Sequence, residues 1–290
     1  MNSLCIKTNN EDILKYLQNE FSSFNMLNTF YSQKEFKYYK NIIIHYTGID
    51  EELFYTKLAT ILSYLVVDYF EINILKTILN TNYFYFENFE LKKILNLCEE
   101  NLCDSSEYSF QNRQLLLFDI FYEYISTHNS IILTGFINFR LGNYRNLLGE
   151  IVDFSVNEFI IEREYLEFVS LLRLYVHSQS TSNRIIHAIS LKNEIILLDE
   201  NMEKIKIDKN LQKAKYLSDV SFSNNDFVLN TLLNLLPKNI YIHLVSPSSN
   251  VDFINTLQLI FEGHITICHD CNICNICNLY KKIYNKNLKH

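Results

Sequence analysis

The sequence predicts an α+β protein in which a helical middle is flanked by terminal segments that contain strands. Three observations predict this class. Short β-branched runs gather near the two ends, apolar residues recur every three to four positions through the middle, and a strand–helix–strand pattern precedes the last residues. Of the 290 residues 48% are hydrophobic, so the chain has ample material for a core.

The N-terminal α/β segment, residues 1–49, is expected to fold as strand, helix, strand and strand. Leu4–Thr8 has a short β-favouring pattern. Asn10 then precedes a helical pattern, where its side chain can accept hydrogen bonds from the first free amides. Thr29–Phe36 and Tyr38–Tyr46 follow as strands, and the isoleucines of the second indicate that it is buried.

The helical region covers residues 50–180. Asp50 is in a capping position, and apolar residues from Phe54 to Ile72 recur at helical spacing. The strongest helical pattern is Asn146–Val176. Because it is apolar on most of its circumference, we expect it to be the central helix, surrounded by others. Further helices are predicted at Glu90–Leu102, Gln111–Ile125 and Ile132–Phe139.

The C-terminal α/β segment, residues 181–268, is followed by a Cys-rich basic tail, residues 269–290. A hairpin is predicted first, then a helix that stops before Pro237, then a βαβ unit with parallel strands and a right-handed crossover. The ranges are Arg184–Leu191 and Glu194–Leu198 for the hairpin, Asp226–Leu236 for the helix, and Ile240–Val245, Val251–Phe261 and His264–Cys268 for the βαβ unit. This order is compatible with one sheet shared by both ends of the chain.

Composition limits the partners. A formal net charge of −7 argues against a large phosphate-binding surface, so nucleic acid is not the expected partner. The N-terminus lacks an export signal, and the apolar runs are too short to span a bilayer. We therefore expect a cytoplasmic protein without a membrane span. Its seven cysteines would remain reduced there, which favours metal binding or redox chemistry over disulfides.

Four cysteines follow one another at C-x-x-C spacing after the last predicted strand: Cys268, Cys271, Cys274 and Cys277. This spacing lets two thiolates bind one ion from a tight turn. A continuous helix would rotate successive sulfurs apart by about 60°, so convergence requires a folded loop. We expect three or four of the sulfurs to meet. His264, His269, Cys98 or Cys103 are candidates to complete the set.

Zinc is the first candidate because it prefers tetrahedral sulfur and nitrogen ligands. An iron–sulfur cluster is the second, although the fourth cysteine follows after two residues rather than three and no proline comes next. The remaining interpretation is a tail with a three-residue repeat and idle thiols. The cysteine spacing does not choose among these three.

A second candidate is a polar site formed by Arg140, Asn157, Glu158 and Glu162, in which two carboxylates four residues apart share a helix face. Such residues could bind a cation or act as acid and base, but ion pairs on a solvated edge are the more common arrangement. Histidines form a third group. His177, Gln179, His187 and His243 could line a polar pocket, although the alternation around His187 makes no case for a shared ligand and isolated structural histidines are more common.

Several blocks of the chain resemble the YtxC-type sporulation proteins of endospore-forming bacteria. The blocks are Thr134–Leu141, Ile151–Asp153, Asn157–Phe159, Glu164–Val169, Leu197–Glu200, Pro237–His243, Leu259–Glu262 and Thr266–Cys268. They keep their order over the last two thirds of the chain. Because they are rich in packing residues, they indicate a family without indicating a reaction.

Taken with this resemblance, the sequence favours a sporulation-associated protein that acts through contacts with an unidentified protein partner and carries a C-terminal cysteine knuckle. No nucleophile elbow, Walker loop or dinucleotide-binding glycine fingerprint is present, so no enzymatic activity is predicted. Two alternatives remain open. One is an iron–sulfur redox protein, and the other is a zinc-knuckle protein whose tail contacts nucleic acid.

Overall fold

The computed structural model describes residues 2–104, 109–191, 194–206, 223–244, 250–268, 271, 272 and 274. The chain divides into two compact units, Met1–Glu162 and Arg163–His290. Each unit has a four-stranded mixed sheet, so the class is α+β as predicted. The alternative of one sheet shared by both ends is wrong, because the described strands of residues 2–132 pair only with one another, and so do those of residues 182–268.

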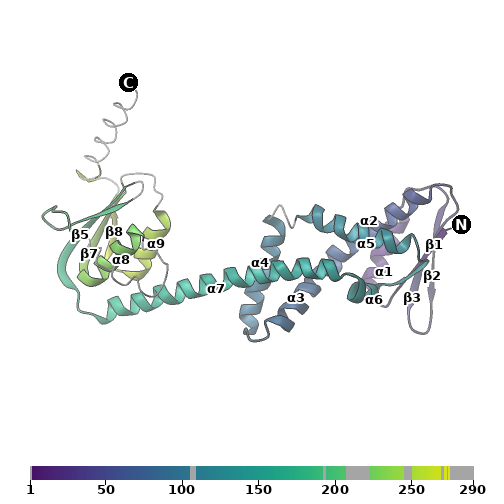
Figure 1. The fold of residues 1–290 in the computed structure, drawn as a ribbon, viewed down its shortest axis with the longest axis horizontal. Coiled ribbons are helices and arrows are strands. Elements are labelled where there is room, and N and C mark those ends of the chain that lie inside the picture. Colours follow the sequence, from purple (N-terminus) through teal and green to yellow (C-terminus); the bar gives the residue numbers. More distant parts are fainter. Residues whose placement is uncertain are drawn as a thin grey trace, which may run out of the picture. The chain divides into compact units, whose positions relative to one another are not determined.

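The first sheet has the strand order β2-β3-β1-β4, and Figure 1 labels β1, β2 and β3 near the N-terminus. β1 (Asn2–Thr8), β2 (Thr29–Glu35) and β3 (Lys40–Tyr46) are antiparallel neighbours and confirm the predicted strands. β4 (Ser130–Ile132) pairs parallel with β1 and was not predicted, since three residues carry no readable alternation. α1 (Glu11–Ser22) begins after Asn10, whose side chain accepts hydrogen bonds from the amides of Asp12 and Ile13.

The helices of the first unit largely follow the predicted ranges. They are α2 (Glu51–Tyr69), α3 (Glu71–Asn82), α4 (Asn88–Asp104), α5 (Phe110–Ile125) and α6 (Leu133–Arg140), followed by the start of α7 (Gly142–Ser178). Asp50 caps α2 by accepting a hydrogen bond from the Leu53 amide at 3.0 Å. The apolar pattern from Phe54 to Ile72 is not one helix, because the chain bends by 49° between α2 and α3. This bend leaves Glu71 buried at the start of α3.

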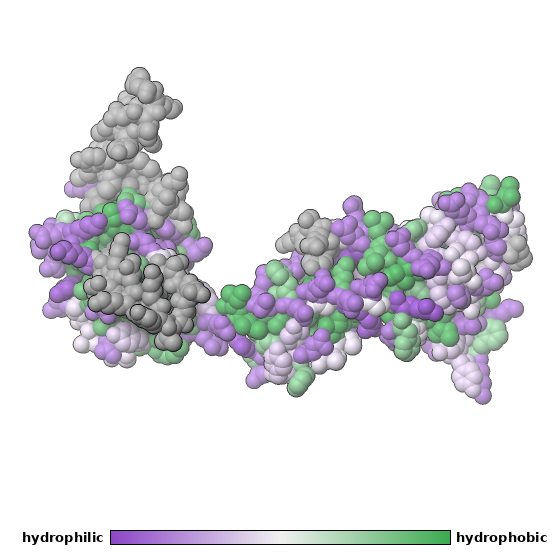
Figure 2. Space-filling view, in the orientation of Figure 1, coloured by the Kyte–Doolittle hydropathy of each residue, from purple (hydrophilic) through white to green (hydrophobic). Residues whose placement is uncertain are grey.

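α7 is the long helix that the sequence predicted, but the expectation that other helices surround it holds only in part. In the first unit most of its apolar residues, including Leu148 and Val152, belong to the core, whereas Phe154 and Ile161 are exposed. Beyond Glu162, Val169 and Val176 are buried, whereas other apolar side chains are exposed. The exposed ones include Leu166, Phe168, Leu171 and Leu174. Figure 2 shows hydrophobic surface along this helix.

The second sheet has the order β6-β5-β7-β8 and holds the candidate site. β5 (Ser182–Ser190) and β6 (Ile195–Leu198) form the predicted antiparallel hairpin, and β7 (Pro237–Leu244) lies parallel between β5 and β8 (Ile265–Cys268). α8 (Asn224–Leu235) ends before Pro237 as predicted, and α9 (Val251–Ile260) connects β7 to β8. The predicted βαβ unit with parallel strands is therefore confirmed.

α8 and α9 share one apolar core with this sheet. Val228 and Leu232 of α8 and Leu257 of α9 are buried together with Ile240 and Ile242 of β7. Among the described residues, no single helix has both the length and the apolar composition of a membrane span. The bent pair of α2 and α3 reaches that composition and length only when the two are taken together.

Candidate metal centre

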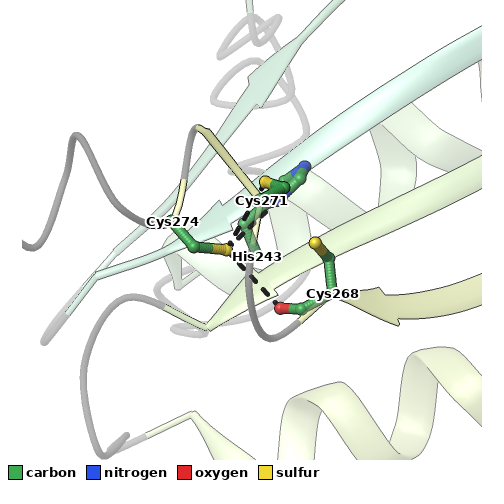
Figure 3. A group of neighbouring side chains, drawn as sticks. All are labelled: His243, Cys268, Cys271 and Cys274. Carbon is green, nitrogen blue, oxygen red and sulfur yellow. Dashed lines mark hydrogen bonds between the residues drawn. The ribbon is translucent and has the colours of Figure 1, made fainter.

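The candidate site lies where two parallel strands of the second sheet end. His243 of β7 is paired in register with Cys268, the last residue of β8. Because parallel strands end at the same edge of a sheet, their carboxyl ends bring these two side chains together. Cys271 and Cys274 follow shortly after β8, and Figure 3 shows all four side chains gathered at the ends of the two strands.

The four side chains are close enough to share one ion. One ligand atom from each of His243, Cys268, Cys271 and Cys274 lies within 4.8 Å of all the others. Cys271 Sγ is 3.3 Å from His243 Nδ1 and 3.7 Å from Cys274 Sγ. Cys274 Sγ is 3.6 Å from the same Nδ1 atom and 3.6 Å from the carbonyl oxygen of Cys268.

These distances match the edges of a zinc tetrahedron. With Zn–S bonds of about 2.3 Å and Zn–N bonds of about 2.0–2.1 Å, two sulfurs are about 3.8 Å apart and a sulfur and a nitrogen about 3.5 Å. The Cys271–Cys274 and cysteine–His243 distances lie within a few tenths of an ångström of those values. Three thiols and one imidazole form one of the ligand sets of structural zinc sites. The cluster could therefore hold a metal ion such as zinc.

Burial sets the protonation of the metal-free cluster. Cys274 and His243 are buried, and Cys268 and Cys271 are partly exposed. Burial raises the pKa of the Cys274 thiol to about 11. Burial also lowers the pKa of His243, and the neighbouring His187 lowers it further. His243 is therefore neutral near pH 7, as a metal ligand must be, while Cys274 keeps a proton that a cation would displace.

Three of the four predicted cysteines meet in this cluster, and Cys277 lies outside the described residues. Of the predicted candidates for an additional ligand, the three that the structure describes do not join it. His264 is bonded to the Lys238 carbonyl oxygen at 2.9 Å, Cys98 is buried in the core of the first unit, and Cys103 is exposed there. His269 and the rest of the tail, apart from Cys271, Asn272 and Cys274, also lie outside the described residues.

His243 is not among the metal ligands that the sequence predicts. The predicted βαβ unit does contain the information needed to identify this ligand, because parallel pairing of Ile240–Val245 with His264–Cys268 places His243 near Cys268. Two of the predicted histidines do meet, since His187 Nδ1 lies 2.9 Å from His243 Nε2. His177 lies elsewhere, with its ring 6.4 Å from that of His264.

The residues of the candidate polar site lie apart. Arg140 ends α6, whereas Asn157, Glu158 and Glu162 belong to α7. Asn157 is 15 positions after Gly142, the first residue of α7, which corresponds to about 22 Å along a helix. Glu158 accepts a hydrogen bond from the Asn101 side chain at 2.8 Å. The structure therefore does not bring Arg140 together with the three α7 residues.

Arg140 instead lines a cavity of about 550 Å³ between the end of α5, α6 and the start of α7. Its guanidinium carbon is 5.9 Å from the centre of the Tyr124 ring. The Tyr124 ring in turn stacks on His128, with ring centres 4.2 Å apart. Glu123 and Phe139 also line this cavity. The cavity is thus lined by one basic side chain, Arg140, and one acidic side chain, Glu123.

Comparison with protein families agrees with the quoted blocks. The model of the YtxC-like family matches residues 56–266, most of the chain. The chain belongs to the YtxC-like family. The YtxC-like match includes His187 and His243 and ends two residues before Cys268. No curated protein and no solved structure matches the chain. The assignment to the YtxC-like family names no reaction, so the chemistry must come from the cluster itself.

Proposed function

We propose that this protein acts in the cytoplasm during sporulation through contacts with another protein, and that a zinc ion bound by His243, Cys268, Cys271 and Cys274 stabilises its C-terminal end. The family match, together with the resemblance to YtxC-type sporulation proteins, supports the cellular role. The four clustered ligand atoms support the zinc knuckle and are the observation that carries this proposal.

The ligand set favours zinc over an iron–sulfur cluster. The common clusters are held by four cysteines, whereas here the fourth ligand within the described residues is His243. A cluster spreads its ligands over two or more irons, so ligands on different irons must lie farther apart than ligands of a single ion. Edges of 3.3 to 3.7 Å suit one ion.

The same set favours a structural role over a catalytic one. Catalytic zinc keeps a position open for water or substrate and takes three protein ligands. Four protein ligands would close the coordination sphere. The ion would then connect the ends of β7 and β8 with the residues that follow, and function would depend on the surface that this arrangement presents.

Metal analysis of the untagged protein tests the zinc knuckle. We expect one zinc per chain in the wild type, none in the Cys268→Ser/Cys271→Ser variant, and one in the Cys103→Ser control, since Cys103 lies outside the cluster. Brown protein that contains iron and sulfide would support the redox alternative. Wild-type protein without metal, with all of its thiols open to alkylation, would contradict the knuckle.

A conditional deletion in the source organism tests the cellular role. We expect fewer spores from the deletion strain and normal numbers after complementation with the wild type. If Cys271→Ser complements as well as the wild type does, the zinc knuckle is not needed for the role in sporulation. A deletion strain that sporulates normally in every assay would contradict the role itself.

A further inference from the structure

Both ring nitrogens of His243 have a partner, and the partners differ in chemistry. Nδ1 faces the sulfurs of Cys271 and Cys274 at 3.3 and 3.6 Å. Nε2 lies 2.9 Å from Nδ1 of His187 on β5. The two rings are nearly parallel, with centres 5.2 Å apart and an interplanar angle of 23°. His187 therefore lies directly behind the candidate ligand, on the side away from the thiols.

The partners determine which nitrogen carries the proton. A neutral imidazole has one N–H donor and one acceptor nitrogen, and only the acceptor can bind a metal. If Nδ1 of His243 binds the ion, Nε2 must carry the hydrogen and donate it. The acceptor within reach is Nδ1 of His187, which must then hold its own hydrogen on Nε2.

We propose that His187 is the positioning residue of the metal centre: it accepts a hydrogen bond from His243 Nε2 and thereby fixes the tautomer and ring orientation in which His243 Nδ1 binds the metal. This inference rests on the proposed zinc knuckle. Outer partners of metal-binding histidines commonly have this role, and their loss reduces metal affinity by about 10- to 100-fold.

The second sheet holds His187 in place for this role. β5 and β7 are parallel neighbours, and His187 is paired in register with Tyr241, two residues before His243. The rings of His187 and Tyr241 stack with centres 5.4 Å apart and an interplanar angle of 20°. His187 thus packs against both Tyr241 and His243 from one position on β5. A side chain confined in this way can orient its neighbour at low entropic cost.

Zinc affinity of the full chain, measured by competition with a chromophoric chelator, tests the role of His187. His187→Phe keeps a flat ring against Tyr241 but removes the acceptor, and we expect its zinc affinity to fall about 10- to 100-fold. His187→Asn places a carbonyl oxygen near the former Nδ1 position and should recover most of the loss. His177→Phe is the matched control, since His177 is exposed and outside the cluster.

A long-range proton–nitrogen NMR spectrum of zinc-loaded protein gives a readout that a purely structural role of His187 would not change. We expect zinc on Nδ1 and hydrogen on Nε2 of His243. Zinc on Nε2 of His243 would overturn the inference, as would a His187→Phe affinity within about twofold of the wild type. If His187→Phe fails to fold, the wild-type spectrum and the zinc affinity of His187→Asn still test the positioning role.

The proposed function fails separately from this inference. A wild type that binds no zinc, or binds it equally well after Cys271→Ser, removes the knuckle and the role of His187 with it. A wild type that binds one zinc through Cys271 but is indifferent to His187→Phe keeps the knuckle and rejects only the positioning role.

Discussion

Arg113 of α5 holds the carboxylate of Glu71 of α3 through two hydrogen bonds, from Nε to Oε2 at 2.9 Å and from Nη2 to Oε1 at 3.2 Å. Both side chains are only 6% exposed, so this ion pair lies in the core. The Tyr144 hydroxyl donates a further hydrogen bond to Glu71, and Arg113 Nη1 donates one to the Leu102 carbonyl oxygen at 3.0 Å. The pair thus joins α3, α4, α5 and α7.

Arg113→Met should strongly destabilise the protein. The substitution leaves the Glu71 carboxylate buried without its cation, and breaking a buried pair from one side costs about 3–5 kcal/mol. Urea unfolding followed by circular dichroism measures this loss. Tyr144→Phe should cost less, about 1–3 kcal/mol, because it removes one hydrogen bond to a charged group.

Two variants make this prediction specific. Arg173→Met removes an arginine whose pair with Glu262 is about half exposed, so it should cost about 0–1 kcal/mol. Glu71→Leu combined with Arg113→Met removes both charges and should restore part of the stability that Arg113→Met loses. A single Arg113→Met variant as stable as the wild type would show that the pair contributes nothing.

Gly48 should not tolerate a side chain. A Cβ atom there would overlap the phenol ring of Tyr46. That ring cannot move freely, because Tyr46 is 4% exposed and its ring stacks on Phe54 with ring centres 5.1 Å apart. The Tyr46 hydroxyl oxygen also accepts a hydrogen bond from the Asp50 amide at 3.0 Å. We expect Gly48→Ala to cost about 1–3 kcal/mol in unfolding free energy.

Gly149 provides the opposite case within the same unit. It lies inside α7, and a Cβ atom there would meet nothing within 4 Å. Since glycine in a helix interior is less favourable than alanine, Gly149→Ala should stabilise the protein by about 0.5–1 kcal/mol. Equal effects of Gly48→Ala and Gly149→Ala on the urea midpoint would contradict this explanation.

Elements that depend on interactions between residues close in sequence could be predicted. Elements that depend on contacts between residues far apart in sequence could not. Asn10 and Asp50 mark helix starts because their side chains bond amides two or three residues away. The bend after Tyr69 could not be predicted, because no glycine or proline marks it in the sequence. The exposed apolar residues of α7, such as Leu171, could not be told from buried ones, since the helical pattern does not show which neighbours are present.

For the candidate site too, only the ligands close together in sequence could be predicted. The spacing of Cys268, Cys271 and Cys274 was readable because these ligands are near in sequence. His243 is 25 residues before Cys268, and only the register of β7 and β8 brings the two together. The prediction of parallel strands there contained this information, but a specific register was needed to use it.

Zinc affinity should rise with pH. Burial raises the pKa of Cys274 to about 11, so near neutral pH zinc must displace its proton. Each proton released on binding raises the apparent association constant about tenfold per pH unit. Cys274 alone therefore predicts a gain of about a hundredfold between about pH 6.5 and about pH 8.5. Chelator competition across this range measures the gain.

The histidine ligand should not contribute to this slope. Burial lowers the pKa of His243 below its ordinary value of 6.5, so this residue is mostly neutral across the range and releases far less than one proton. Cys274→Ser is the informative variant, because it removes one thiol and should make the dependence on pH shallower. An affinity that is constant with pH would mean that the thiols do not bind zinc as thiolates.

Removal of zinc should loosen β7 and β8 and leave β1 and β3 unchanged. The ion would join His243 of β7 to Cys268 of β8 and to Cys271, so it would stabilise only the folded second unit. The stabilisation would be about 2.7 kcal/mol at a free zinc concentration of about a hundred times Kd.

Hydrogen exchange measured by mass spectrometry, with and without a chelator, distinguishes the effect on the two sheets. Amides of β7 and β8 that exchange only through unfolding should exchange about a hundredfold faster after chelation, because exchange follows the free energy of opening. Cys271→Ser should exchange at the chelated rate in both conditions. Equal acceleration in both sheets, or none in β7, would mean that the cluster does not connect these strands.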